Sequence, residues 1–282
     1  STQAKTLFPY TTLFRSHHNS EDMVDNIAFF RFEKDAAWHD FDGYADNQYF
    51  IDPCKLLLTT PGIDRETGNY EATGIPAAVL AHYLRERSLI PEKADLNSIL
   101  FLLTPAENMA KFQHLVATIA RFEELYQANV PVASMLPTLV KAYPQYQKMR
   151  IQDLCHKMHD FYRKHQLNVL LQQMFQREHL PAVSMDPHRA HDAYIRNQIE
   201  LVPLSEIEGR IAVEGALPYP PGVLCIVPGE VWGGATLQYF RALEEGVNEL
   251  PGFEPEIQGV YWERDANGRK YATAYVLKNN QI

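Results

Sequence analysis

The sequence predicts an α/β domain followed by a mixed α+β domain. Its 282 residues exceed the usual size of a single domain. Up to about residue 130, predicted strands and helices alternate, which is typical of an α/β layer. Beyond residue 199 the apolar pattern changes to short runs typical of strands, interrupted by one helical stretch. We therefore predict a domain boundary near residue 130.

In the first domain the predicted elements alternate in type. Pro61-Gly62 ends the first strand, and Pro76 suits the first turn of the helix after it. The last helix is predicted to start with Thr104 as N-cap and Glu107 at the third helical position. After a short apolar run at 27–32, the predicted strands are 50–60 and 99–103, and the predicted helices are 76–87 and 104–127.

The second domain is predicted to follow a connection over residues 129–150, which is rich in Pro, Ala, Tyr and Gln. Helical spacing of apolar residues then predicts helices over 151–162, 169–177, 188–196 and 236–247. The predicted strands are 199–203, 210–213, 223–227, 257–262 and 271–277.

The segment from Glu214 to Glu230 has the most distinctive composition, because proline and glycine surround a short apolar run. Proline fixes φ and glycine frees it, so such a backbone follows one path with sharp corners. We interpret it as a scaffold that positions a buried strand at Val223–Val227 and its flanking loops.

The overall composition is that of an ordinary globular protein, with 46% hydrophobic and 22% charged residues. A formal net charge of −9 argues against nucleic acid and anionic membrane as partners. No apolar run approaches the ~18 residues of a membrane span. The three cysteines, in apolar contexts, suggest neither a disulfide framework nor a zinc site, so we expect a cytoplasmic protein.

The first twenty residues stand apart from the rest. The stretch Thr6–Ser16 has neither helical nor strand periodicity and looks like translated adapter sequence joined to a truncated gene. We expect residues 1–20 to be a non-native leader and exclude them from the fold prediction.

A cluster around His156, Lys157 and His159 invites two functional interpretations, a metal site or a lysine that holds pyridoxal phosphate (PLP) as a Schiff base. The histidines are three residues apart, whereas helical metal ligands more often lie four apart or include carboxylates. No Gly- or Ser-rich loop accompanies Lys157. The pattern therefore favours a structural helix, and we predict no metal site.

Two further patterns also favour structural roles. Gly233-Gly234 before a helix could bind phosphate at the helix N-terminus, but the rest of a phosphate-binding fingerprint is missing, which favours a hinge. An acid–base cluster could form from the residues His39, Asp46, Asn47 and Asp52, but loop carboxylates usually serve in caps and turns.

The charged segment Pro91–Asp95 precedes a buried strand. Its plain interpretation is a solvated turn. The functional alternative is that a carboxylate at the strand entrance holds the ammonium group of a ligand through a charge-assisted hydrogen bond. The residues by themselves favour the turn.

Several long segments resemble one enzyme family. They are Asp46–Ile63, Leu96–Glu107 and Glu214–Gly234, and the likeness extends from about residue 25 to 278. They are similar to the Orn/Lys/Arg decarboxylases, PLP-dependent enzymes with the aspartate-aminotransferase fold. Two segments resemble the ornithine branch in particular: Asp52-Pro-Cys-Lys-Leu-Leu-Leu-Thr-Thr60 and Gly215-Ala-Leu-Pro218.

This resemblance implies an enzyme that converts L-ornithine to putrescine and CO₂ with PLP, as a homodimer or dimer-based assembly. The family's PLP-binding Ser-x-His-Lys motif is absent from this sequence. The resemblance therefore implies a C-terminal portion: the small domain of the PLP fold (21–130) and the family's C-terminal domain (131–282). We expect the isolated chain to contain no catalytic or cofactor-binding residues and to be inactive.

One functional residue follows from the resemblance. In the family, a glutamate of a Glu-Lys pair before the small-domain strand meets the distal amine of the substrate, and Glu92 occupies that position. We therefore expect Glu92 to bind the side-chain ammonium of ornithine. The alternatives are a lysine or arginine decarboxylase of the same family, a non-catalytic oligomerisation module with an exposed apolar face, or an unrelated α+β binding protein.

Overall fold

The computed structural model describes residues 43–279 except 46, 51, 53, 65–66, 105 and 220–221. These residues form two compact units that divide between Asp160 and Phe161. The first unit thus extends past residue 130, where the sequence suggested a domain boundary. The predicted leader, the apolar run at 27–32, and the residues His39 and Asp46 lie outside the described residues.

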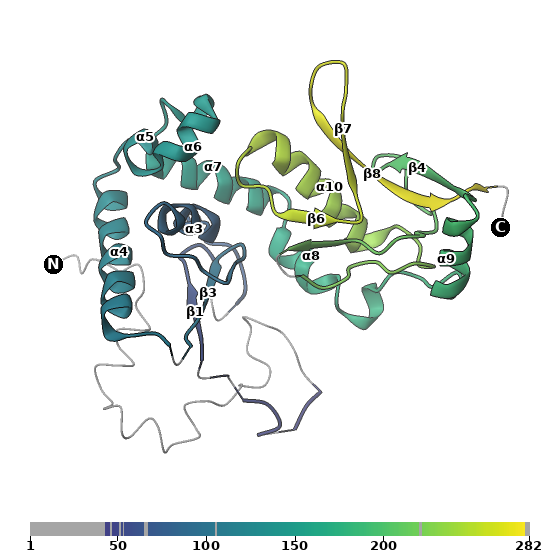
Figure 1. The fold of residues 1–282 in the computed structure, drawn as a ribbon, viewed down its shortest axis with the longest axis horizontal. Coiled ribbons are helices and arrows are strands. Elements are labelled where there is room, and N and C mark those ends of the chain that lie inside the picture. Colours follow the sequence, from purple (N-terminus) through teal and green to yellow (C-terminus); the bar gives the residue numbers. More distant parts are fainter. Residues whose placement is uncertain are drawn as a thin grey trace. The chain divides into compact units, whose positions relative to one another are not determined.

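The first unit contains a three-stranded antiparallel sheet in the order β1-β3-β2. Its strands β1 and β3 lie side by side in Figure 1. The strands are β1 (Lys55–Thr59), β2 (Lys93–Ala94) and β3 (Ser98–Leu102). The helix α3 (Ala77–Arg85) packs against β2, β3 and the long helix α4 (Met109–Gln127). The alternation of side chains along a strand buries Ile99 and Phe101 of β3 and leaves Leu102 half exposed.

Two boundaries of the first unit differ from the prediction. β1 begins only at Lys55, because the Asp52 side chain accepts a hydrogen bond from the backbone N–H of Cys54 (2.9 Å) and holds a turn there. The N-cap of α4 is Asn108, whose side chain accepts from the N–H of Lys111 (3.1 Å). Thr104 instead opens a turn before the helix, so the predicted start was wrong.

The stretch predicted as a connection is helical in part. It contains α5 (Val132–Met135), α6 (Pro137–Ala142) and the 3₁₀-helix η2 (Pro144–Tyr146). Prolines divide it into these short pieces, and its apolar side chains are buried. The helix α7 (Ile151–Lys164) follows, as predicted from its apolar spacing.

The second unit is built on the antiparallel sheet β4-β8-β7 and a separate strand pair, β5 with β6. The strands are β4 (Ile199–Pro203), β5 (Leu217–Tyr219), β6 (Glu256–Gln258), β7 (Tyr261–Arg264) and β8 (Lys270–Leu277). The helices are α8 (Leu167–Gln173), the 3₁₀-helix η3 (Arg177–His179), α9 (Pro187–Ile195) and α10 (Gly234–Glu249). α10 packs against α8 and β8, and α9 packs against β8.

Three strand predictions in this unit were wrong. Residues 210–213 and 223–227 form only isolated bridges, and Val223 and Leu224 are about half exposed rather than buried. The third, the predicted strand 257–262, is broken into β6 and β7 at Gly259. This residue has φ +78°, and a Cβ there would lie 2.1 Å from the carbonyl oxygen of Gly215.

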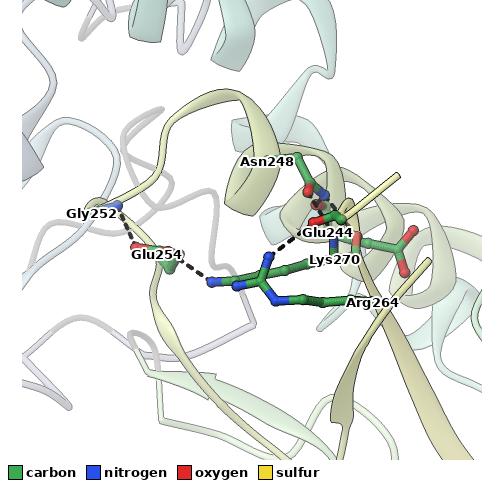
Figure 2. Close-up of polar contacts among 7 residues, drawn as sticks. Glu244, Asn248, Gly252, Glu254, Arg264 and Lys270 are labelled. Atoms are coloured by element: carbon green, nitrogen blue, oxygen red, sulfur yellow. Dashed lines mark hydrogen bonds and ion pairs between the residues drawn. The ribbon is translucent and has the colours of Figure 1, made fainter. Parts of the chain in front are cut away.

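Side chains of α10 complete one edge of β8 where β4 no longer covers it (Figure 2). The Asn248 side chain donates to the carbonyl of Lys270 (2.8 Å) and accepts from the N–H of the same residue (2.9 Å). The Glu244 carboxylate accepts from the N–H of Ala272 (2.7 Å). Backbone groups left without a strand neighbour are thus satisfied by helix side chains.

Candidate functional site

Glu92 lies immediately before β2, at the edge of the small sheet. Its backbone N–H donates to the carbonyl of Leu100 on β3 (2.8 Å), which fixes the residue against the central strand. Its side chain remains 35% exposed and points toward the Lys55 ammonium, with 3.4 Å between Nζ and Oε1. The carboxylate is therefore held on a rigid element and remains accessible to solvent.

The pairing with Lys55 is itself informative, because an ammonium group already occupies the place that a ligand ammonium would take. Both partners are more than a third exposed. Exposed ion pairs of this kind contribute about 0.2–1 kcal/mol. A ligand that brings its own ammonium group can displace such a weakly held lysine. Sequence reasoning missed Lys55, and only the pairing of strands β1 and β3 brings it near Glu92.

The predicted turn around Glu92 is partly a strand. Lys93 and Ala94 form the two-residue edge strand β2, which pairs with Leu100 and Ile99. The turn proper follows, with the N–H of Asp95 donating to the carbonyl of Ser98 (2.8 Å). Glu92 itself precedes β2, but its backbone is hydrogen-bonded to the sheet through Leu100 and is not part of a solvated loop.

The first unit exposes several large apolar side chains, which we call its open apolar surface: Leu57, Ile90, Leu102, Met109 and Val116. Ile90 is 80% exposed and Met109 70%. A cavity of about 310 Å³ lies in this region, lined by Ile90 and Leu102 together with side chains of α4. Isolated exposed apolar residues are common, but Ile90 and Leu102 are exposed beside the same cavity, and this combination is typical of an interaction surface.

The His156-Lys157 pair does not form a cofactor site. Both side chains are exposed on α7, whereas a Schiff-base lysine needs an enclosed pocket for the cofactor ring. His159, on the same helix, is fully buried. The described residues therefore do not fit PLP. Among them, no group of three His, Cys, Asp or Glu side chains is placed to hold a metal ion.

His159 has a structural role that its sequence context did not reveal. Its Nε2 lies 2.9 Å from the carbonyl oxygen of Glu71, and its ring packs edge-on against Tyr70. A Cβ on Gly74 would lie 2.4 Å from its Nδ1, so only glycine fits there. The histidine thus fastens the loop after β1 to α7, and the favoured structural interpretation of this pair of histidines agrees with the geometry.

The remaining sequence candidates have structural surroundings. Gly233 and Gly234 open α10, and Gly234 takes the left-handed conformation with φ +55°. Asp52 caps the turn before β1, and Asn47 occupies another turn with φ +61°. Cys155 and Cys225 are buried, as their apolar context predicted, but Cys54 is exposed, contrary to that prediction.

Comparison with known proteins identifies the family. Residues 168–278 match the model for the Orn/Lys/Arg decarboxylase C-terminal domain, and residues 11–111 match the model for the major domain of the same family. The chain belongs to the Orn/Lys/Arg decarboxylase family. The resemblance drawn from the sequence is confirmed.

Two relatives from Escherichia coli K12 show how much of the family's length is present. The inducible ornithine decarboxylase is 56% identical over 94% of this chain and 36% of its own length. The constitutive ornithine decarboxylase is 58% identical over 91% of this chain and 36% of its own length. The chain thus spans about a third of the curated relatives it matches.

Solved structures of Orn/Lys/Arg decarboxylases also match. The constitutive lysine decarboxylase of E. coli aligns with a TM-score of 0.80 at 34% identity, covering 90% of this chain and 36% of that one. Lysine decarboxylase A from Pseudomonas aeruginosa gives 0.81 at 34% identity, covering 90% and 34%. The two-unit layout therefore fits the family. No helix among the described residues is long and apolar enough to span a membrane.

Proposed function

We propose that this chain is part of an ornithine decarboxylase, which converts L-ornithine to putrescine and CO₂. The carrying observation is the difference in identity between branches. Ornithine decarboxylases are 48–58% identical to this chain, whereas lysine decarboxylases are 34–35% identical. This gap supports ornithine over lysine as the substrate of the whole enzyme.

The finer fold and cellular assignments belong to the same proposal. The first unit would be the small domain of an aspartate-aminotransferase-like fold, and the second the family's C-terminal domain. The whole enzyme would be a cytoplasmic homo-oligomer built from dimers. When bound elsewhere in that enzyme, PLP would supply the electron sink for decarboxylation.

Within this enzyme, Glu92 would bind the distal ammonium of ornithine. Its carboxylate is exposed, it lies on the edge of a sheet, and it already holds the ammonium of Lys55. A charge-assisted hydrogen bond of this type contributes about 1.5–3 kcal/mol, or roughly ten- to a hundredfold in binding. Glu92 would therefore recognise the substrate without taking part in bond cleavage.

The expectation that the isolated chain is inactive can be tested directly. The isolated polypeptide, supplied with PLP and L-ornithine, is expected to release no putrescine, because neither its sequence nor its described residues offer a Schiff-base site. Robust putrescine release, measured by chromatography, would contradict this part of the proposal.

The role of Glu92 requires a complete active site. We suggest a chimera in which this chain replaces the matching third of the E. coli inducible ornithine decarboxylase, with Glu92→Gln introduced. KM for ornithine should rise about ten- to a hundredfold. The control Asp95→Asn removes a nearby carboxylate that pairs with Lys93 (3.6 Å) and should leave KM within about twofold. An unchanged KM in the Glu92 variant would disprove the assignment.

A second candidate function is that of a non-catalytic interaction module. The open apolar surface of the first unit favours it, because such surfaces drive association in water. Light scattering should show concentration-dependent self-association, which Ile90→Glu reduces and Leu180→Glu, at an exposed site in the second unit, does not. A monodisperse monomer at all concentrations would count against this candidate.

A further inference from the structure

Three tyrosines and one carboxylate gather in the second unit, far in sequence from Glu92. Tyr275 of β8 lies between Tyr261 of β7 and Tyr194 of α9, with ring centroids 5.1 and 5.7 Å away and rings nearly perpendicular to its own. The Tyr261 hydroxyl donates to Oε2 of Glu214 (2.8 Å). Strand pairing and helix packing thus bring together four residues that span more than eighty positions of the chain.

Tyr275 packs against the buried core of the unit, but the other members of the cluster reach solvent. Tyr194 and Tyr261 keep 38% and 39% of their surface exposed, and Glu214 is half-buried. Elsewhere in the unit, Glu200 pairs with Arg210 and Glu245 with Lys164. Among the described residues, by contrast, no lysine or arginine forms an ion pair with Glu214. The carboxylate therefore has a phenol as its partner and no counter-charge.

The electrostatic field at the cluster is negative. Burial, followed by the hydrogen bond to Glu214, raises the pKa of the Tyr261 phenol above its ordinary value, and the neighbouring Tyr194 and Tyr275 add to the effect. Burial disfavours any charge, so the attraction for a cation comes from the Glu214 carboxylate itself. The aromatic rings act in the same direction, because the face of a tyrosine ring carries negative potential and attracts cations.

We propose that Tyr194, Glu214, Tyr261 and Tyr275 form a binding site for a small alkylammonium ion. The ammonium group would donate to the free carboxylate oxygen of Glu214, and its alkyl part would lie against the tyrosine rings. The site is separate from Glu92, and the proposal does not depend on the assignment of that residue. Its ligands would share one chemistry, a compact positive head on a short apolar chain.

The test is a titration of the full 282-residue chain, labelled with ¹³C in its tyrosine rings, with n-butylammonium chloride followed by NMR. Saturable shifts are expected for the signals of Tyr194, Tyr261 and Tyr275. n-Butanol, which has the same apolar chain without charge, and NaCl at matched ionic strength should not produce them. Absence of saturable shifts, or equal shifts with either control, would overturn the proposal.

A matched pair of variants separates this site from general electrostatics. Glu214→Gln should weaken butylammonium binding about tenfold or more, because it removes the charge and keeps the shape. Glu263→Gln serves as control. Glu263 also accepts from a tyrosine hydroxyl on the same hairpin (Tyr271, 2.7 Å), but within the described part of the chain the Tyr271 ring belongs to no aromatic cluster. Equal affinity of the wild-type chain and Glu214→Gln for butylammonium would disprove the proposal.

Two more readouts guard against ambiguous results. Thermal unfolding of each variant shows whether the fold is kept, and Tyr275→Leu provides a second variant that removes a ring without altering charge. Its affinity should also fall. If the tyrosine signals change with protein concentration and not with butylammonium, the face is a contact between copies of the chain, and the proposal is wrong.

Discussion

Replacing Asn248 with alanine tests how α10 is coupled to the sheet of the second unit. The Asn248 amide makes two hydrogen bonds to the backbone of Lys270, one as donor and one as acceptor (Figure 2). It thus replaces the strand neighbour that β8 lacks at this point. Asn248→Ala removes both bonds, together with a third that the amide donates to the carbonyl of Glu244 (2.9 Å), and leaves the N–H and C=O of Lys270 without these partners.

The magnitude follows from the number of bonds and from their burial. A neutral intramolecular hydrogen bond contributes about 1 kcal/mol net, and leaving a buried partner unsatisfied costs about 1–3 kcal/mol. Asn248 and Lys270 are both half-buried, so water can reach part of the exposed edge. We therefore expect the free energy of unfolding of the second unit to fall by about 2–3 kcal/mol.

The assay is urea unfolding followed by the fluorescence of the two tryptophans of the second unit, Trp262 on β7 and Trp232, which is 1% exposed and packs edge-on against Phe240 of α10. A Trp38→Phe background removes the tryptophan outside the described residues. Asn267→Ala, in the exposed turn between β7 and β8, is the control and should change stability by less than about 0.5 kcal/mol. A loss below 0.5 kcal/mol in Asn248→Ala would refute the reasoning.

Three further predictions concern stability and reactivity. Gly259→Ala should lower the free energy of unfolding by about 2 kcal/mol or more, because the added Cβ would lie 2.1 Å from the Gly215 carbonyl oxygen. Gly268→Ala has a similar φ but open space around it, and should lower that free energy by about 1 kcal/mol. The urea midpoints of the two variants measure the difference. Burial raises the pKa of Glu244 above its ordinary 4.5, so its folded form prefers the proton. This preference stabilises the fold at low pH, and the contribution is lost as pH rises. The wild-type chain should therefore lose stability relative to Glu244→Gln as pH rises from 4.5 to 7. Equal urea midpoints for the two proteins across this range would contradict the prediction. A thiol reagent should label one exposed cysteine, Cys54, in the native chain and all three after denaturation, since the other two thiols are buried and burial raises the pKa of one of them, Cys225, to about 12.

The elements that the sequence predicted well are those whose own residues bury an apolar face. α7, α10, β4 and β8 have clear apolar spacing and lie close to their predicted ranges. The failures occurred where backbone geometry overrides apolar content. The apolar run Val223–Val227 is confined between proline- and glycine-rich stretches, and two of its side chains face solvent.

For the candidate sites too, the sequence predicted only what neighbouring residues in the chain reveal. The sequence supplied Glu92 only through resemblance, because a glutamate in a charged turn has no distinguishing local signal. It gave no sign of Lys55 or of the tyrosine cluster, whose members lie on different elements. The sequence allowed two roles for His159, a metal ligand or a buried structural residue. The close packing of Gly74 against its ring favours the structural role.

The sequence by itself determined the family, the order of most helices and strands, and the absence of the Ser-x-His-Lys motif, because each of these depends on residues that are neighbours in the chain. Tertiary structure alone decided which charges meet and which remain without a counter-charge. Strand register brings Lys55 to Glu92, and among the residues that the structure describes it leaves Glu214 with a tyrosine hydroxyl and no ion pair. Electrostatic energy depends on distances through space, and these distances are fixed only when the strands pair and the helices pack.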